Sequence, residues 1–247
     1  MPAKKEHWRA NGRVRGKIQV SKDGPYSVSG GIPLAKWVVV TDSQGYSHSW
    51  RKDKDYEPRE SYALCRCGRS KKLPFCDGSH VQAGFDGRET AGREPYLDHA
   101  DETVGPTLDL TDAHEFCIGV GFCDRAGGTW SLTEQSDDPE ARQTAVEEAA
   151  NCPSGRLVAW DKQGHPLEPD LQPSIGVVEN PEVGMRGPLW VRGGIPIGSA
   201  DGHVYEVRNR VTLCGCGKSC NKPFCDGTHK DRQEREEAGE DDATQVL

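Results

Sequence analysis

The 247-residue sequence is poor in apolar side chains, which make up 34% of it, and it contains no long apolar run. No segment is therefore apolar enough to span a bilayer, and we expect no membrane association. Residues 1–9 are basic but lack the apolar region of a signal peptide, so we expect a cytoplasmic protein. With 31 basic against 39 acidic side chains, the chain also lacks the positive charge of a nucleic-acid-binding protein, and we expect no nucleic-acid partner.

Recognisable catalytic motifs are missing as well. The sequence shows no catalytic triad, no paired carboxylates for acid–base work, no Walker loop and no Rossmann fingerprint. The glycine pairs Gly30-Gly31 and Gly127-Gly128 are typical of turns and not of a phosphate-binding loop. We therefore expect that the chain is not an enzyme.

What the sequence does have is ten cysteines, which in a cytoplasmic protein point to bound metal more than to disulfides. Metal would also support folding, because 7% aromatic residues and 29 glycines leave each module only a modest core. Most of the cysteines fall in two stretches of identical spacing, displaced by 149 residues (214 − 65, 225 − 76, 229 − 80). The shared positions are Cys65, Cys67, Cys76 and His80 in the first stretch and Cys214, Cys216, Cys225 and His229 in the second.

The spacing within each stretch suits two metal atoms. A Cys-x-Cys pair in extended backbone can place both sulfurs on one metal. Cys76 and His80 are four residues apart, so they share one face if Asp77-Gly78 opens a helical turn. Two ligands from each half suit a two-iron cluster. A zinc site is one alternative, although zinc usually takes Cys-x2–4-Cys pairs. A disulfide is another, although it would be strained within Cys-x-Cys.

Both stretches resemble the CDGSH iron–sulfur domain of the NEET protein family, whose pattern is C-x-C-x2-[ST]-x3-P-x-C-D-G-[ST]-H. Each matches at every specified position, with Ser70 and Ser219 at the hydroxyl position and Thr228 as the one change in the namesake pentapeptide. The resemblance implies one [2Fe–2S] cluster in each stretch. The implied ligands are Cys65 and Cys67 on one iron with Cys76 and His80 on the other, and likewise Cys214 and Cys216 with Cys225 and His229.

A third set of cysteines lies between the two stretches. Cys117 and Cys123 form a Cys-x5-Cys pair, and Cys152 is followed directly by proline, as is the last ligand of bacterial ferredoxin motifs. Residues 107–161 are similar to the divergent 4Fe–4S mono-cluster domain, a small ferredoxin-like module. That resemblance implies a third iron–sulfur cluster.

The type of this third cluster depends on its ligands. A [3Fe–4S] cluster needs only the three cysteines, whereas a [4Fe–4S] cluster needs His114, Asp112 or an outside group as a fourth ligand. Two alternatives remain: the module has lost its cluster, or the cysteines pack as small apolar side chains.

The pattern of short strands and Gly/Pro turns predicts an α+β fold made mostly of short β-strands. Asp138 followed by proline predicts a helix from Pro139 to Asn151, with a strand at residues 157–160. Residues 205–213 alternate with a period of two and predict a strand that leads to Cys214.

The internal repeat extends upstream of the cysteines. Residues 24–33 are mirrored by residues 187–196 at an offset of 163, so the first copy has an insertion of fourteen residues (163 − 149) between Pro33 and Cys65. We expect a first CDGSH module at 14–97, a ferredoxin-like α/β module at 98–172, a second CDGSH module at 173–235 and a charged tail at 236–247.

Tandem-motif members of the resembled family are similar to the family's single-motif homodimer. The resemblance therefore implies that the two outer modules pack on each other as an intramolecular pseudo-twofold β-cap, in a monomeric pseudo-dimer. The alternative is two independent modules on a linker.

These features predict an iron–sulfur protein that acts in electron transfer, in cluster transfer, or in both, with redox proteins or apo-iron–sulfur proteins as partners. The alternatives are a structural zinc-binding interaction module and an electron-relay subunit of a reductase complex. The histidine ligand predicts a cluster that loosens as pH falls.

Cys220 has no counterpart in the first motif, and we interpret it as a free thiol, with a spare ligand as the alternative. Basic side chains around the motifs would offset cluster charge and dock an acidic partner: Arg66, Arg69, Lys71, Lys72, Lys218, Lys222 and Lys230.

Overall fold

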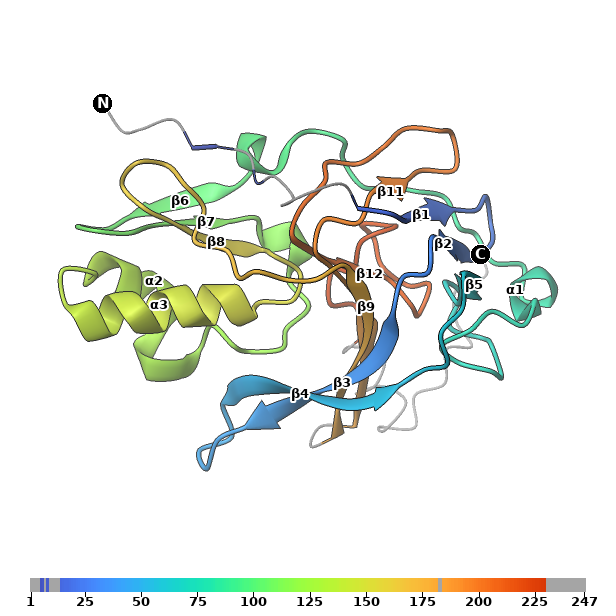
Figure 1. The fold of residues 1–247 in the computed structure, drawn as a ribbon, viewed down its shortest axis with the longest axis horizontal. Coiled ribbons are helices and arrows are strands. Elements are labelled where there is room, and N and C mark those ends of the chain that lie inside the picture. The colour runs from blue at the N-terminus through green and yellow to red at the C-terminus, as the bar shows by residue number, and fades with distance from the viewer. Residues whose placement is uncertain (1–4, 7, 9–13, 182–183, 230–247) are drawn as a thin grey trace, which may run out of the picture.

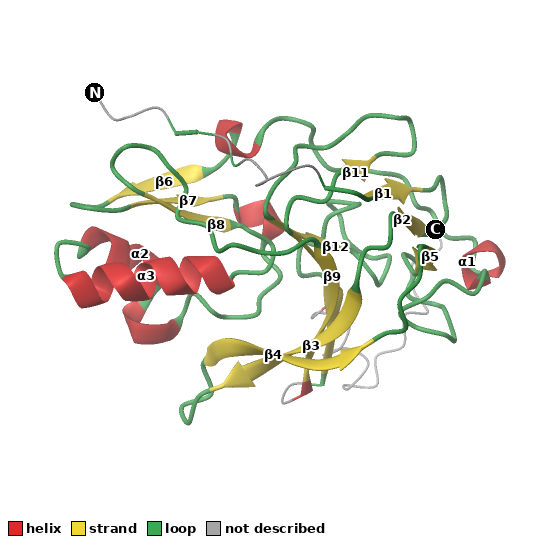
Figure 2. Ribbon diagram, in the orientation of Figure 1, coloured by secondary structure: helices red, strands yellow, loops and turns green. Residues whose placement is uncertain are grey.

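The computed structural model describes residues 5–6, 8, 14–181 and 184–229 of the chain. The expected charged tail, residues 236–247, the end of the last expected module and Lys230 lie outside these residues. In the described part, short strands form three sheets and helices are few, which confirms the predicted α+β fold (Figures 1 and 2). Among the described residues, no helix combines the length and the apolar character that crossing a bilayer requires.

The first sheet contains four strands in the order β11, β1, β2, β5. Ile18 and Val20 of β1 are buried and Lys17 is exposed, which is the alternation expected of a strand with one face on the core. The strands of this sheet are β1 (Lys17–Val20), β2 (Tyr26–Ser29), β5 (Ser61–Leu64) and β11 (Ile197–Gly198).

The second sheet contains five strands in the order β12, β10, β9, β3, β4. In Figure 1, β3 and β4 form a long hairpin that extends away from the first sheet. The strands of this sheet are β3 (Leu34–Thr41), β4 (Ser47–Asp55), β9 (Ser174–Asn180), β10 (Met185–Arg192) and β12 (Arg210–Leu213).

The two repeats exchange one strand with each other. In the first sheet, β11 from the second repeat pairs in parallel with β1, with Ile18 opposite Ile197. In the second sheet, β3 from the first repeat pairs in parallel with β9, with Leu34 opposite Ile175. The antiparallel pairs also correspond, because Tyr26 lies opposite Leu64 in one sheet and Leu189 lies opposite Leu213 in the other. These pairs keep the offsets of the sequence repeat (189 − 26 = 163 and 213 − 64 = 149).

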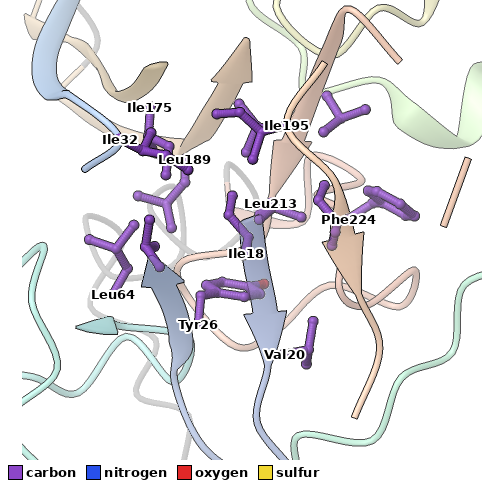
Figure 3. Close-up of a cluster of buried hydrophobic side chains, with 14 of the residues drawn as sticks. Ile18, Val20, Tyr26, Ile32, Leu64, Ile175, Leu189, Ile195, Leu213 and Phe224 are labelled. Atoms are coloured by element: carbon purple, nitrogen blue, oxygen red, sulfur yellow. The ribbon is translucent and has the colours of Figure 1, made fainter. Parts of the chain in front are cut away.

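One hydrophobic core serves both repeats. It combines side chains of the first repeat with side chains of the second (Figure 3). Because neither repeat has a core of its own, the alternative of two independent modules on a linker is wrong. The labelled members of this core are Ile18, Val20, Tyr26, Ile32, Leu64, Ile175, Leu189, Ile195, Leu213 and Phe224.

The fourteen-residue insertion is the β3–β4 hairpin. Ala35 of β3 pairs with Asp55 of β4, twenty positions later (55 − 35), whereas the equivalent Gly198 pairs with Val204 after six (204 − 198). The difference accounts for the whole insertion. The hairpin carries Trp37 and Trp50, which pack against a second cluster of buried side chains. Its members are Val39, Ile118, Val120, Phe122, Val178, Trp190 and Cys225.

The predicted strand at residues 205–213 is wrong in its length, because β12 begins only at Arg210. The N–H of Tyr205 donates to the carbonyl of Ile197, and Val204 bridges to Gly198. The first part of the alternating pattern therefore belongs to a pairing with β11, and only the second part leads to Cys214.

The central module is a three-stranded antiparallel sheet with two helices packed on one face (Figure 1). The predicted helix is confirmed as α3 (Pro139–Asn151), and the Asp138 carboxylate caps it by accepting from the N–H of Glu140 at 2.7 Å. The other elements are β6 (Asp101–Val104), β7 (Asp109–Asp112), β8 (Leu157–Trp160), α2 (Thr129–Glu134) and 3-10 turns at Tyr96–Asp98, His114–Phe116 and Arg125–Gly127.

Candidate metal centres

Each motif is a loop that closes back on the strand that delivers its first cysteine. In the first copy, β5 ends at Leu64, and the N–H of Cys65 donates to the carbonyl of Pro74 at 2.8 Å. The N–H of Cys76 donates to the carbonyl of Ala63 at 2.9 Å, so the two halves of the motif lie side by side. The second copy repeats both bonds, from Cys214 to Pro223 and from Cys225 to Thr212, each at 2.9 Å.

The paired cysteine sulfurs lie at the separation of two ligands on one metal. The Sγ atoms of Cys65 and Cys67 are 3.7 Å apart, and those of Cys214 and Cys216 are also 3.7 Å apart. Two thiolates bound tetrahedrally at about 2.3 Å would sit about 3.8 Å from each other. A disulfide would require about 2.0 Å. All ten cysteines are free thiols, so the disulfide alternative is wrong.

The cysteine and histidine of each motif form a second donor pair. Helix α1 (Ser79–Gln82) starts after Gly78, as the sequence predicts, and it turns His80 back toward Cys76. The Sγ of Cys76 lies 3.4 Å from Nδ1 of His80, and the Sγ of Cys225 lies 3.3 Å from Nδ1 of His229. These separations also suit two ligands of one metal.

A hydroxyl and a carboxylate brace each loop. Ser70 Oγ donates to the carbonyl of Phe75 at 2.6 Å, and Asp77 accepts from the Ser79 hydroxyl at 2.6 Å and from the Lys71 N–H at 2.8 Å. The hydrogen bond from Ser79 is the main reason that the pKa of Asp77 is well below its usual range. The carboxylate is therefore ionised whenever the loop is formed.

The same braces occur in the second motif. Ser219 Oγ donates to the carbonyl of Phe224 at 2.7 Å, and Asp226 accepts from the Thr228 hydroxyl at 2.7 Å. Burial would raise the pKa of Asp226, but hydrogen bonds from Thr228 and from the Cys220 N–H lower it. The two loops are thus built in the same way.

Tyr26 couples the two repeats at the second motif, and sequence reasoning missed it. Its hydroxyl lies 2.9 Å from the carbonyl oxygen of Cys214 and 3.0 Å from that of Pro223, so it can donate to either. Burial raises the pKa of Tyr26 well above its usual value, which keeps this donor protonated. The sequence repeat gave no indication of this role, because Leu189 occupies the position equivalent to Tyr26 in the second copy.

Arg66 has a different place from the one expected of it. Only 2% of it is exposed, and its guanidinium donates to the carbonyls of Ser21 at 2.9 Å and Gly87 at 2.6 Å. It therefore closes the first motif onto the β1–β2 turn and does not face a partner. Arg69, Lys71, Lys72 and Lys218 are exposed, as the docking role requires.

The two Cys-x-Cys loops pack directly on each other. A Cβ added to Gly68 would lie 2.8 Å from the carbonyl oxygen of Cys216, and one added to Gly217 would lie 3.2 Å from that of Cys67. Both glycines have positive φ, 70° and 80°, so a larger residue would be strained as well as crowded. The two donor sets are therefore neighbours in space.

A cavity of about 640 Å³ opens between the two motifs. Because donor atoms border open space here, the residues fit a group larger than a single ion. Among its lining residues are Cys65 from the first motif and Cys216, Cys225 and His229 from the second.

Burial makes some of these thiols hard to ionise. It raises the pKa of Cys67 and of Cys225. The hydrogen bond from Cys216 lowers the pKa of Cys214 to about 6 and raises that of Cys216 itself. Each Cys-x-Cys pair therefore contains one thiol with a raised pKa, Cys67 or Cys216, whose proton a metal must displace when it binds.

Cys117 and Cys123 lie near Arg156, and Cys152 lies near Cys123. The Cys117 sulfur and the carboxylate of Asp112 raise the pKa of this guanidinium, against the effect of its burial. Burial raises the pKa of Cys123, and the neighbouring charge of Cys152 adds to that effect. Cys123 and Cys152 also pack against the core between α2, α3 and the third sheet.

The structure disfavours one of the two internal candidates for a fourth ligand. Both carboxylate oxygens of Asp112 accept from Arg156, at 2.5 and 2.8 Å, and one also accepts from Trp130 Nε1 at 3.2 Å. His114 lies exposed on the 3-10 turn that precedes Cys117. Cys220 is exposed, and its N–H donates to Asp226 at 2.7 Å, as expected for a thiol outside the ligand set.

Two family models match the chain. The model described as iron-binding zinc finger CDGSH type matches residues 23–81 and 186–230, which contain both predicted ligand sets. The model described as divergent 4Fe-4S mono-cluster matches residues 103–162, which contain Cys117, Cys123 and Cys152. Both resemblances inferred from the sequence are thereby confirmed. No curated protein and no solved structure is significantly similar to the chain.

Proposed function

We propose that this chain, which carries two CDGSH-type iron-binding regions and one divergent 4Fe–4S mono-cluster region, binds two [2Fe–2S] clusters and serves as a carrier of electrons and of clusters. The observation that carries the proposal is the arrangement of donors in pairs, at 3.7 Å for Cys-x-Cys and 3.3–3.4 Å for Cys–His, in both motifs. Each iron of a [2Fe–2S] cluster takes two ligands from the protein, because the bridging sulfides supply the other two.

The pairing favours two irons over one zinc. A structural zinc ion takes four protein ligands around one atom. Among the residues that the structure describes, no group of three or more His, Cys, Asp or Glu side chains is placed to hold a single ion. Two separate pairs in each motif therefore support a two-metal cluster.

In this proposal Cys65 and Cys67 hold one iron of the first cluster, and Cys76 and His80 hold the other. Cys214 and Cys216 hold one iron of the second, and Cys225 and His229 hold the other. The cluster supplies one-electron chemistry, and the chain positions it, shields it and sets its charge. One neutral imidazole in place of a thiolate makes the site less negative, so its reduction potential should lie above the roughly −400 mV of plant-type ferredoxins.

The central module is proposed to hold a third cluster on Cys117, Cys123 and Cys152. A [3Fe–4S] cluster needs only these three, whereas a [4Fe–4S] cluster would take His114 or an outside group as its fourth ligand. The placement of Cys117 and Cys123 near Arg156, and of Cys152 near Cys123, supports one shared site for the three thiols.

We also propose that the outer modules form a pseudo-twofold β-cap within one chain, which acts as a monomer. The reciprocal exchange of β3 and β11 supports it, because each repeat completes the sheet of the other. The partners would be redox proteins or apo-iron–sulfur proteins with an acidic surface, which the exposed Arg69, Lys71 and Lys72 would attract. The chain has no catalytic site of its own in this proposal, and we propose a cytoplasmic location.

Metal and sulfide analysis of anaerobically purified protein tests the proposal. A red-brown protein with iron and acid-labile sulfide in similar amounts is expected. A colourless protein with stoichiometric zinc would replace the proposal with a structural zinc module. The third cluster is tested by replacing all eight outer ligands with alanine, after which residual iron and sulfide must bind in the central module.

A further inference from the structure

The two outer centres have the same local geometry but different surroundings. Cys225 is 2% exposed and His229 is 7% exposed, whereas their counterparts Cys76 and His80 are both half-buried. Helix α1, which carries His80, contains no buried residue, and its Val81 is 74% exposed. The Cys–His pair of the first centre is therefore partly exposed to solvent, whereas that of the second is buried and borders the cavity between the motifs.

A loop of the central module covers the second centre. Residues 116–122, here called the cover loop, bring Ile118, Val120 and Phe122 into one apolar cluster with Cys225. The ring of Phe116 meets the ring of Phe224 edge-on, with centroids 5.4 Å apart. Apolar side chains thus exclude water from the cysteine of this centre.

The glycine two residues before each histidine shows the difference between the two centres. A Cβ added to Gly227 would lie 2.8 Å from the carbonyl oxygen of Cys117, whereas one added to Gly78 would meet nothing within 4 Å. Both glycines have φ of 88°, so they share this backbone angle but differ in their neighbours. The cover loop touches the second motif, whereas none of the described residues takes its place at Gly78 of the first.

The inserted hairpin holds the cover loop in position. Trp50 of β4 packs on Phe122 with ring centroids 4.9 Å apart, and its indole N–H donates to the carbonyl of Asn151 at 3.0 Å. Ser47 donates a hydrogen bond of 2.5 Å to the carbonyl of Val120. At the equivalent place the second repeat has only the short turn between Gly198 and Val204, so the described residues offer no such support for a cover over the first centre.

We propose that the two outer centres have divided roles: the first, with His80, passes its cluster to acceptor proteins, and the second, with His229, retains its cluster beneath the cover loop. This inference rests on the proposed function. In the transfer, four acceptor thiols replace the three thiolates and the imidazole on the two irons. Their protons pass to the thiolates and to the imidazole or water, and no electron moves. Among the described residues, Cys76 and His80 are more exposed than Cys225 and His229, so we expect an acceptor to reach the irons of the first centre more readily.

Two single-centre proteins allow the test. Replacement of Cys214 and Cys216 by alanine leaves the first centre, and replacement of Cys65 and Cys67 leaves the second. Each full-length protein is mixed anaerobically with apo-ferredoxin of the plant type, and the circular dichroism of the holo-ferredoxin product reports transfer. We expect transfer from the first centre to be at least about tenfold faster, which corresponds to about 1.4 kcal/mol in the barrier.

Alanine substitutions at Gly227 and at Gly78 separate the effect of the cover loop from the effect of backbone strain. Gly227→Ala in the second-centre protein should push the cover loop away and speed transfer at least about fivefold. Gly78→Ala in the first-centre protein places alanine at the same backbone angle and measures the effect of strain alone. Phe122→Ala loosens the loop from the hairpin without touching the motif, and it should also speed transfer from the second centre if Gly227→Ala does not fold.

The outcomes are distinct. Similar transfer rates from the two centres, or an effect of Gly227→Ala no larger than that of Gly78→Ala, would overturn the division of roles while both clusters remain. If neither single-centre protein contains a [2Fe–2S] cluster, the proposed function itself fails. Faster transfer from the first centre, with acceleration of the second by Gly227→Ala or Phe122→Ala, supports the inference.

Discussion

At the scale of single residues, one imidazole would distinguish each proposed outer centre from an all-thiolate site. Nδ1 of His80 and of His229 lies beside a cysteine sulfur in the same way in both motifs. A neutral ring in place of a thiolate removes one negative charge from the cluster, and the ring can exchange iron for a proton. The reduction potential and its pH dependence should therefore depend on this side chain.

Replacing His80 or His229 by cysteine should lower the reduction potential of that centre and flatten its dependence on pH, because a thiolate adds charge and does not titrate near neutrality. Redox titration followed by electron paramagnetic resonance measures both effects. His48→Cys, which adds a thiol at an exposed position of β4, is the control and should leave both potentials unchanged. An unchanged potential in His80→Cys and His229→Cys would contradict the ligand assignment.

Arg66 is expected to stabilise the fold. Arg66→Ala should lower the free energy of unfolding by at least about 2 kcal/mol, because it leaves the carbonyls of Ser21 and Gly87 without their donor in a buried place. Chemical denaturation of the two proteins measures the difference. Arg69→Ala, on the other side of Cys67 and exposed, should change stability by less than about 0.5 kcal/mol. Equal effects would mean that Arg66 is not a structural residue.

The pairing of the cysteine and histidine side chains could be predicted from the sequence, because their spacing is local and occurs twice. The roles of Tyr26 and Arg66 could not, because each depends on a carbonyl group far away in the chain. Tyr26 reaches Cys214, and Arg66 reaches Ser21, through contacts that only the folded molecule creates. The positive charge of Arg66 was the basis for predicting that it lies on the surface.

At the scale of elements, the β3–β4 hairpin decides how the central module sits on the outer ones. The sequence located this insertion between Pro33 and Cys65 but gave no reason for it. In the structure its two tryptophans contact the cover loop and β10. The hairpin is therefore the support through which the central module covers the second motif.

Trp50→Ala should reduce the free energy of unfolding by about 3 kcal/mol, since the ring stacks on Phe122 and on Trp190 at centroid distances of 4.9 and 4.8 Å. Denaturant titration with the clusters in place measures this. Tyr46→Ala, in the turn before β4 and 42% exposed, provides the control and should cost less than about 0.5 kcal/mol. A small effect of Trp50→Ala would show that the hairpin does not support the module.

Helix α3 carries a buried carboxylate whose charge is unfavourable. Burial raises the pKa of Glu148, despite a hydrogen bond from the Thr129 hydroxyl at 2.7 Å. A carboxyl whose pKa is raised in the folded state stabilises most below its unfolded pKa of about 4.3, and this stability is lost as pH rises through the folded pKa.

In Glu148→Gln the side chain cannot ionise, so the variant does not lose stability as pH rises. Its free energy of unfolding relative to that of the wild type should therefore increase from pH 5 to pH 8. Unfolding free energies across that range measure the trend. Glu147→Gln changes the exposed neighbour on the same helix and should show no trend. A difference that stays constant with pH in Glu148→Gln would contradict the raised pKa.

Elements were predictable where a local signal marks their ends. Asp138 and the following proline fixed the start of α3, and the proline after Cys152 fixed its end. The alternation of residues 205–213 led to the wrong prediction of one long strand. Two short segments there pair with different strands, one after the other, without a break in the pattern. A period of two shows which residues face the core but not which strand pairs with them.

At the scale of the whole molecule, the exchange of β3 and β11 joins the two repeats into one folding unit. The family resemblance predicted that the outer modules pack on each other, and the core that they share agrees with this packing. The parallel pairing of β1 with β11 and of β3 with β9 was beyond sequence reasoning, since these strands are far apart in the chain and each is short. The same distance hid the contact between the cover loop and the second motif.

The central claim is that the chain holds paired irons on mixed sulfur and imidazole ligands, in duplicate. Pulsed electron paramagnetic resonance of the reduced protein tests it most directly, because it detects nitrogen bound to the cluster. The account predicts a strong histidine nitrogen coupling in the wild type that disappears in the His80→Cys, His229→Cys double variant while the cluster signal remains. A reduced protein without a cluster signal, or with one that shows no bound nitrogen, would contradict it.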